Sequence, residues 1–389
     1  MRSSPGAPVI PLPVRGGQAG YGSAPGALRA EGPADAVLVA TVLTLTALGL
    51  VMVLSSSYTR GLGQFGDPYH FFKRQVLYGL AAWGVALGCL RVAPRQLDRF
   101  SGWLVILAYV LLAAVLVVGE EIGGARRWIR FPFVNLQPSE LAKLACVNFA
   151  ASWSGRRKDA MDRFWAGPAL PLAAALGAAA LILLEPDFGT AVVLVAVCIT
   201  VLFAAGMSVW QLAALAVLAV PAAGALIWIE PYRMARLLAF VDPWADPSGR
   251  GWSVIQSLLA IGSGGLFGLG LGQSRQKFLY LPEHHTDFIF AILAEELGLV
   301  GTWAVLALFG VLAWRGFRVA LALEDRYEQL LACGLVMLLV GQALLNVGVV
   351  SGSLPVTGIP LPFISYGGSS LVGSMTAVGL LLRLSRRVT

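Results

Sequence analysis

The sequence has 389 residues, of which 57% are hydrophobic and 13% are charged, whereas an average soluble domain has about 45–50% and about 25%. This composition excludes an ordinary soluble enzyme and predicts an all-α integral membrane protein folded as one polytopic bundle. The four cysteines all lie in apolar stretches, so we expect them to be packing residues, and we expect neither a disulfide nor a cysteine metal site.

Residues 1–35 differ from everything that follows. They hold six prolines and seven glycines and no apolar run, so they cannot bury enough surface to offset the entropy of the chain. We predict a disordered cytoplasmic tail. Because it lacks the apolar region of a cleavable signal peptide, the first membrane helix would serve as the insertion signal.

A helix needs roughly 20 apolar residues to cross the hydrocarbon core of a bilayer. By this measure residues 36–384 form a domain of ten transmembrane helices, and residues 385–389 form a short cytoplasmic C-terminus. The predicted spans are 36–57, 75–92, 102–119, 139–154, 167–184, 189–206, 211–229, 287–313, 329–351 and 367–384.

The basic residues predict the orientation of these spans. With a cytoplasmic N-terminus, the inner segments collect most of the arginines, as the positive-inside rule requires. They are Arg91, Arg95, Arg99, Arg156, Arg157, Arg163, Arg315, Arg318, Arg326, Arg383, Arg386 and Arg387, together with Lys158. An even number of spans then places both termini in the cytoplasm. The net charge of +7 reflects topology and contact with anionic lipid, and nothing in it suggests nucleic acid.

The segment 230–286 joins the seventh and eighth spans and is far longer than an ordinary connection, since loops beyond about 12–15 residues are usually functional or disordered. Its stretch VIQSLLAIGSGGLFGLGLG is too apolar for disorder. We therefore predict a large extracytoplasmic loop with short interfacial helices. Arg233 and Arg236 lie in this loop, on the side of the membrane where basic residues are disfavoured, and such placement requires a reason.

Four polar clusters are predicted at the outer boundary of the membrane. The first contains Arg126 and Arg127, whose guanidinium groups could clamp a phosphate, although arginines at this depth also reach lipid headgroups. The second contains Glu140 and Lys143, three residues apart on one helix face, with Ser139 as the expected N-cap. An intrahelical ion pair and a polar cavity that solvates Lys143 both fit this spacing.

The third cluster is EPDFGTA, in which Asp187 either caps the following helix or belongs to a site with the other clusters. The fourth is LPEHHTDFIF, with Thr286 as the expected N-cap and Asp287 in the first turn of the eighth span. The helix dipole stabilises a carboxylate at such a position, which is an alternative reason for Asp287.

Glu283, His284 and His285 are also metal-ligand types, but adjacent histidines rarely bind one ion, so we expect no dedicated metal site. Transient Mg²⁺ or Mn²⁺ that bridges Asp287 to substrate phosphates fits better, because these ions use few protein ligands.

Two further carboxylates, Glu295 and Glu296, lie roughly 12 Å deeper in the eighth span. Adjacent helical residues point about 100° apart, so each glutamate needs its own polar partner. Gln342 and Asn346, which share a face of the ninth span, are the expected partners, and we interpret all four as structural.

Seven ordered stretches resemble the SEDS family, the FtsW/RodA/SpoVE proteins of bacterial cell-wall synthesis. They are GARRWI, LQPSELAKL, EPDFGTAVVL, FVDPWADPSGRGW, QSLLAIGSGGLFGLGLG, LPEHHTDFIFAILAEELGLVG and LPVTGIPLPFISYGGSS. The resemblance covers essentially the whole membrane region. DPWADPSGRGW and SRQKFLYLPE resemble the division members of the FtsW type, whereas LPVTGIPLPF is at least as similar to RodA or SpoVE.

The resemblance implies a peptidoglycan glycosyltransferase of the bacterial cytoplasmic (inner) membrane, which polymerises lipid II at the outer face. Its implied partners are a class B penicillin-binding protein and other membrane proteins of the division machinery, and no cofactor is firmly implied. The implied catalytic residue is Asp287. The substrate-binding residues carried over from the family are Arg126, Arg127, Glu140, Lys143 and Asp187.

The polymerisation chemistry requires a base for a sugar hydroxyl, positive charge for a departing pyrophosphate and an apolar path for two lipid tails. Asp287 is the expected base, and Arg126, Arg127 and Lys143 are the expected cations. A RodA-type elongation polymerase is the alternative within the family. A lipid II flippase would also show ten spans and a charged pocket, but these charges cluster at one face. A non-catalytic scaffold predicts that the outer carboxylates are dispensable.

Overall fold

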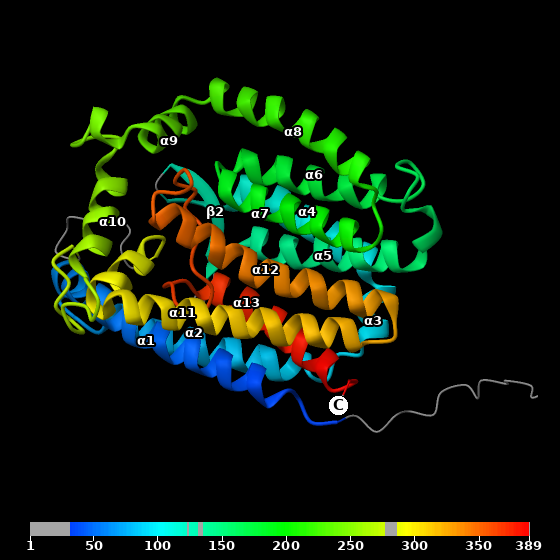
Figure 1. Ribbon diagram of the computed structural model, residues 1–389, viewed down its shortest axis with the longest axis horizontal. Helices are drawn as coiled ribbons and strands as arrows, with labels where there is room; N and C mark the ends of the chain where they lie inside the picture. The colour runs from blue at the N-terminus through cyan, green and yellow to red at the C-terminus, as the bar shows by residue number, and fades with distance from the viewer. Residues whose placement is uncertain (1–31, 123, 131–134, 277–285, 389) are drawn as a thin grey trace, which may run out of the picture. The chain divides into compact units, whose positions relative to one another are not determined.

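The computed structural model describes residues 32–388 except 123, 131–134 and 277–285. The described residues form a bundle of helices that run mostly along one axis, with a small antiparallel sheet at one end (Figure 1). The sheet has the order β1 (Glu120–Ile122), β2 (Ala125–Arg130), β3 (Asn135–Leu136). The helices are α1 (Ala36–Phe65), α2 (His70–Cys89), α3 (Pro94–Arg99), α4 (Ser101–Val118), α5 (Pro138–Arg156), α6 (Ala169–Leu184), α7 (Phe188–Ala204), α8 (Val209–Ile229), α9 (Pro231–Val241), α10 (Trp252–Ser263), α11 (Ile289–Ala322), α12 (Arg326–Val350) and α13 (Gly368–Ser385), with 3₁₀ turns at Lys158–Ala160 and Pro243–Ala245.

The predicted all-α membrane fold is confirmed. Each of the ten predicted spans coincides with a helix of the described chain, namely α1, α2, α4, α5, α6, α7, α8, α11, α12 and α13. Among the described residues, α1, α4, α8, α11 and α12 are long and apolar enough to cross a membrane, and α6 and α7 are shorter apolar helices. The count of ten crossings stays a prediction.

The helices alternate in direction, so the bundle has two distinct ends (Figure 1). The α3 end carries α3, the turn between α11 and α12, and the C-terminus. The α9 end carries α9, α10 and the sheet. Residues 1–31 of the predicted tail, 1–35, lie outside the described residues, whereas the buried carboxylate of Asp35 caps α1 and pairs with Arg315.

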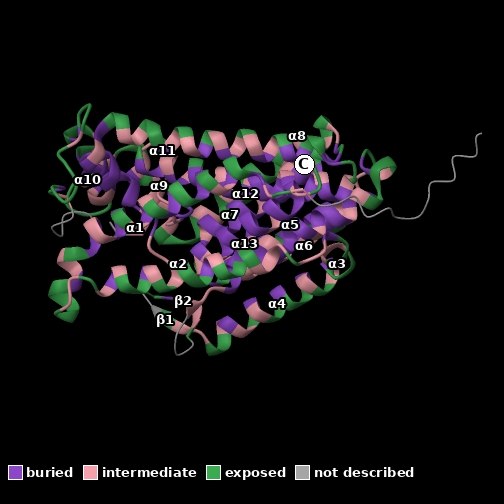
Figure 2. Cartoon of the chain, turned by 90° about the horizontal axis from the view of Figure 1, so that it is seen from below, coloured by how far each residue is buried: buried purple, intermediate pink, exposed green. Residues whose placement is uncertain are grey.

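Helix α12 lies at the centre of the bundle, because it packs against α5, α7, α11 and α13. Buried residues concentrate in these helices, whereas the outer faces of α4 and α11 are exposed, as expected for helices that meet lipid (Figure 2). Helix α8 arches away from the bundle and contains no buried residue. In the predicted outer segment, α10 packs on α11, whereas α9 has a single buried residue.

Helix α11 is interrupted at Gly298, whose φ of 66° lies in the left-handed region. The interruption frees backbone groups that need new partners inside a membrane. The amides of Leu299 and Val300 donate to carbonyls of the glycine-rich segment 264–272, at 2.9 and 3.1 Å. Amides of that segment donate back to the two α11 carbonyls before the break, both at 3.0 Å. The segment therefore replaces the missing turn of helical hydrogen bonds.

The two buried glutamates beside this break have separate partners. Glu295 accepts a hydrogen bond from the amide of Arg275 at 2.9 Å, and Glu296 accepts from the hydroxyl of Ser55 on α1 at 2.7 Å and from the amide of Ser274 at 3.3 Å. The prediction that polar residues of α12 pair with these glutamates is therefore wrong. The described donors to both carboxylates are neutral, and the backbone amides among them hold residues 274–276 against α11.

Candidate active site

The segment that joins α12 to α13, residues 351–367 (the α12–α13 loop), collects polar side chains from several helices. Its backbone carbonyls accept hydrogen bonds from Arg236 of α9 at 3.1 Å, and from Gln342 and Asn346 of α12 at 3.0 and 2.7 Å. The loop holds three prolines and has a positive φ of 75° at Gly358, so it cannot be helical. Irregular backbone within a membrane bundle requires such side-chain partners.

Asp287 lies beside this loop and is half-buried. Its backbone carbonyl accepts a hydrogen bond from Asn346 at 2.7 Å. A methyl group built on Gly358 would lie 3.4 Å from Oδ2 of Asp287 and 3.9 Å from Nη1 of Arg236. The carboxylate and the guanidinium group therefore face the same point of the α12–α13 loop, and glycine leaves that point open.

The predicted helix start at Asp287 is wrong. Helix α11 begins at Ile289, with Phe288 at the N-cap position, so Thr286 is no cap and Asp287 precedes the first turn. The hydroxyl of Ser365 instead donates to the carbonyl of Thr286 at 2.6 Å. Asp287 is thus positioned by backbone contacts with α12 and the α12–α13 loop.

Lys143 and Glu140 form an ion pair inside the bundle, with Nζ and Oε1 3.0 Å apart and both side chains almost fully buried. Lys143 also donates to Oε1 of Gln342 at 2.7 Å. The predicted alternative of an intrahelical ion pair is therefore what the structure contains. The expected N-cap at Ser139 is wrong, because α5 begins at Pro138 with Gln137 at the cap position.

The buried ion pair connects to Asp287 through α12. Gln342 bridges Lys143 to the carbonyl of Pro360, and Asn346, one turn along α12, bridges the neighbouring loop carbonyl to the carbonyl of Asp287. A single row of polar groups on α12 therefore links the two charged centres.

Asp187 caps α7, as one of the two sequence interpretations predicted. Its carboxylate accepts from the amide of Thr190 at 3.1 Å and from the hydroxyl of the same residue at 2.9 Å. The start of α7 also packs closely on the α12–α13 loop, because a methyl group on Gly189 would lie 2.7 Å from the carbonyl oxygen of Thr357. Asp187 is thereby fixed near the loop that contacts Asp287.

The two arginines of the hairpin have different surroundings. Arg127 donates to the carbonyl of Glu185 at 2.9 Å and also to the carbonyl of Pro186, so it ties β2 to the turn between α6 and α7. Arg126 is exposed and lies 3.5 Å from the carboxylate of Glu121. The structure therefore gives Arg127 a bracing contact and leaves Arg126 on the outer surface of the hairpin.

Arg236 is the cation near Asp287 that the sequence analysis did not assign to the site. Besides its bond to the α12–α13 loop, its guanidinium group donates to the hydroxyl of Tyr232 and lies 4.3 Å from the centre of that ring. The signal was present in the sequence, because a basic residue in an outer segment breaks the positive-inside pattern.

Within the described residues, no group of three or more histidine, cysteine, aspartate or glutamate side chains could hold a metal ion. The expectation of no dedicated metal site stays a prediction. Glu283, His284 and His285 lie outside the described residues.

Glu185 lies in the turn between α6 and α7, fully buried, with both carboxyl oxygens unpaired among the described residues. Burial, reinforced by the charge of Asp187 and opposed by that of Arg127, raises the pKa of this carboxyl from 4.5 to about 8. The group is therefore protonated at neutral pH.

This pKa predicts a pH dependence of stability. Between pH 4.5 and about 8 the folded protein keeps a proton that the unfolded chain has released, so the free energy of unfolding falls as pH rises through this window. Glu185→Gln, which cannot ionise, should lose less stability between pH 5 and 8, by up to about 1.4 kcal/mol per pH unit. Thermal unfolding in detergent across that range measures the difference, and identical pH profiles for the two proteins would contradict it.

A family model for a cell cycle protein family, FTSW_RODA_SPOVE, matches residues 35–389. The chain belongs to the FtsW/RodA/SpoVE family. It is 46% identical to the "Probable peptidoglycan glycosyltransferase FtsW" of Alkalilimnicola ehrlichii, over 89% of this chain and 88% of the relative. It is 42% identical to the stage V sporulation protein E of Bacillus subtilis, over 90% and 97%.

A solved structure described as "Structural coordination of polymerization and crosslinking by a peptidoglycan synthase complex" superposes with a TM-score of 0.75 at 35% identity, over 91% of this chain and 98% of the other. The resemblance to the SEDS family found in the sequence is thereby confirmed. Family membership and the apolar helices make this chain a multi-pass membrane protein.

Proposed function

We propose that this chain is a peptidoglycan glycosyltransferase that polymerises lipid II into glycan strands at the outer face of the bacterial cytoplasmic membrane. The observation that carries the proposal is the half-buried carboxylate of Asp287 beside Arg236 at the α9 end of the bundle. The names of the relatives and the similarity to a peptidoglycan synthase complex support the same activity.

The mechanism follows from these groups. Asp287 accepts the proton from the sugar hydroxyl of the acceptor as that oxygen attacks the anomeric carbon of the donor. The bond from that carbon to the pyrophosphate oxygen breaks, and its electron pair leaves with the pyrophosphate. Arg236 donates hydrogen bonds to the departing anion, and Lys143 contributes positive charge from inside the bundle.

The proposed substrate-binding residues include Glu140, Lys143 and Asp187, which are polar groups near the α12–α13 loop. Arg126 remains a candidate for the pyrophosphate, because its side chain is exposed and its contact with Glu121 is long, at 3.5 Å. For Arg127 we propose an indirect role, because its guanidinium group already braces the turn before α7.

Arg236→Gln should lower the rate of polymerisation about 10- to 100-fold, because a hydrogen bond to a charged group contributes about 1.5–3 kcal/mol. Arg233→Gln is the matched control, because it removes the same charge from the same helix. The side chain of Arg233 donates a hydrogen bond to a carbonyl near the end of α8. Initial rates with labelled lipid II measure both. Equal rates for the two variants would remove Arg236 from the site.

A divalent cation belongs to the proposal only as a transient partner. Asp287 would be its protein ligand, and Mg²⁺ or Mn²⁺ bound there would neutralise the pyrophosphate. Polymerisation that persists unchanged in excess EDTA would exclude this requirement.

We assign the chain to septal wall synthesis in division, because the FtsW relatives support it. The further proposals are a class B penicillin-binding protein and other divisome membrane proteins as partners, and cytoplasmic termini. A complex that couples polymerization and crosslinking in the similar structure supports a transpeptidase partner. Depletion in cells tests the subtype: filaments with no septa fit the division role, whereas rounded cells fit the elongation alternative of the RodA type.

The direct test uses the purified full-length chain, with and without its penicillin-binding partner, and labelled lipid II. Glycan ladders support the polymerase. Absence of ladders together with lipid II translocation in vesicles would replace it by the flippase. The scaffold hypothesis predicts a different result. A variant that lacks the outer carboxylates would still recruit the septal transpeptidase.

A further inference from the structure

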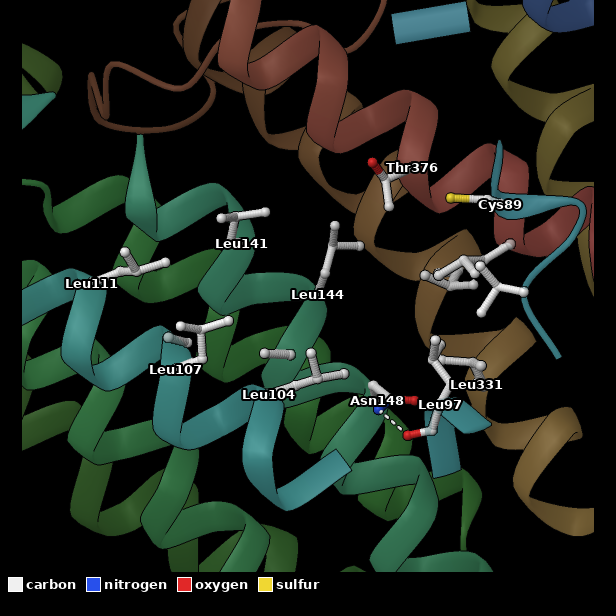
Figure 3. Close-up of a pocket in the computed structure, with 15 residues that line it drawn as sticks. Cys89, Leu97, Leu104, Leu107, Leu111, Leu141, Leu144, Asn148, Leu331 and Thr376 are labelled. Carbon is white, nitrogen blue, oxygen red and sulfur yellow. Dashed lines mark hydrogen bonds between the residues drawn. The ribbon is translucent and has the colours of Figure 1, made fainter. Parts of the chain in front are cut away.

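A cavity lies away from Asp287, beside α4 and towards the α3 end (Figure 3). Its volume is about 230 Å³, and Leu104, Leu107 and Leu111 of α4 face Leu141 and Leu144 of α5 across it. Side chains of α12 and α13 complete the floor, and the segment after α2 closes the α3 end. We refer to it below as the α4 pocket.

The α4 pocket suits hydrocarbon. Its amide, Asn148, donates to the carbonyl of Leu97 at 3.1 Å and accepts from the hydroxyl of Tyr327 at 2.7 Å. The hydroxyl of Thr376, which also lines the pocket, donates to a carbonyl of α13 at 2.7 Å. These polar groups are satisfied within the protein, so they offer little to a polar ligand. Apolar cavities of about 150 Å³ already bind small hydrocarbons, and this one is larger.

The surrounding membrane has access to this pocket. Helix α4 packs against α5 and α6, whereas α2 packs against α1 and α13. The pocket therefore lies between α2 and α4, which have different packing partners. Leu107, which lines the pocket, is also 52% exposed at the surface of the bundle. An acyl chain can therefore enter sideways from the bilayer.

The protein surface at the α3 end of the pocket is positively charged. Val92 and Leu97 line the pocket, and the segment 91–99 that contains them exposes Arg91, Arg95 and Arg99. Asp98, the one acidic residue of that segment, is paired with Arg156 at 2.8 Å. Three exposed arginines on a segment that lines an apolar pocket match a molecule with an anionic head and a hydrocarbon tail.

We propose that the α4 pocket binds one acyl chain of an anionic glycerophospholipid from the leaflet at the α3 end, with its phosphate against the arginines of segment 91–99. The site is independent of the proposed polymerase activity, because its ligand is a bulk lipid and its lining shares no side chain with the Asp287 site. The polyprenyl tail of a lipid-linked substrate is the rival occupant. Its charged group would lie at the α9 end, away from these arginines.

The test places the full-length chain in lipid nanodiscs that contain phosphatidylglycerol with a photoreactive diazirine on one acyl chain. After illumination, peptide mass spectrometry should find the label on α4 and α5 at the pocket. Leu107→Trp, which fills the pocket, should reduce this labelling several-fold. Ile106→Trp is the matched control, because Ile106 is 53% exposed on the same helix and does not line the pocket.

The headgroup is tested with the same diazirine chain on phosphatidylcholine. Phosphatidylglycerol should label the pocket more strongly, and Arg95→Gln with Arg99→Gln should remove the preference, by up to about fivefold for each arginine. Arg318→Gln, an exposed arginine at the same end, should preserve it. Equal labelling by both lipids in the wild type would overturn the proposal. So would labelling by a photoreactive polyprenyl phosphate that phosphatidylglycerol fails to displace.

Discussion

Replacing Asp287 by asparagine should lower the rate of glycan polymerisation by orders of magnitude without unfolding the protein. Asparagine has the same shape and preserves the backbone carbonyl that Asn346 binds, but it cannot accept the proton of an attacking hydroxyl. A general base contributes a factor of about 10²–10⁴, so the rate should fall by that range. Initial rates of ladder formation from labelled lipid II measure the loss.

Asp246→Asn is the control for this variant. Asp246 lies in the outer segment 230–286, which precedes Asp287, in a turn where it pairs with Arg250 at 3.3 Å. Its replacement should leave the rate within about twofold of the wild type, because exposed ion pairs contribute only about 0–1 kcal/mol to stability. If Asp287→Asn formed full-length ladders at the normal rate, another group would have to be the base.

Replacing Lys143 by methionine should destabilise the bundle as well as inactivate it. The substitution leaves Glu140 buried without its cation and removes the donor to Gln342. Loss of one partner of a buried ion pair costs about 3–5 kcal/mol, unless the carboxyl takes up a proton. Thermal unfolding in detergent and polymerisation rates should both fall.

The double variant Lys143→Met with Glu140→Gln separates these two effects. It removes both charges, so most of the stability should return while polymerisation remains impaired, because the cation is absent. Lys73→Met is the control, since Lys73 pairs with Asp67 at 2.9 Å in an exposed position and its loss should cost no more than about 1 kcal/mol. Equal stabilities for the single and double variants would show that Lys143 does not offset the cost of burying the Glu140 carboxylate.

The membrane architecture could be predicted because it depends on runs of apolar residues, and these runs mark helices wherever lipid is the solvent. Helix starts were less predictable. Ser139 and Thr286 are residues that favour N-caps, but Pro138 begins α5 and the contacts of Asn346 hold the chain before α11 in a turn. The small sheet was missed because β1 and β3 have only three and two residues and β2 is rich in arginine.

The charged residues of the candidate site could be named from the sequence because carboxylates and lysines beside apolar helices need a reason. The contribution of the α12–α13 loop was not found, because it acts through backbone carbonyls, which every residue has and no sequence pattern marks. For the same reason Arg127 was expected to meet a phosphate, whereas the fold gives it two carbonyls of the turn before α7. The sequence identified Arg127 as a cation near the site, but it did not identify the groups that Arg127 contacts.

The glycine-rich segment 264–272 has a practical consequence for engineering the chain. Most connections tolerate inserted residues, since their backbone groups bond to water. Here two amides and two carbonyls of the segment are bonded to backbone groups at the break in α11, and a methyl group on Gly268 would lie 2.1 Å from the carbonyl oxygen of Glu296. An epitope tag or a fluorescent probe placed there would shift this register, although the sequence resembles a flexible linker. The segment has to be treated as core.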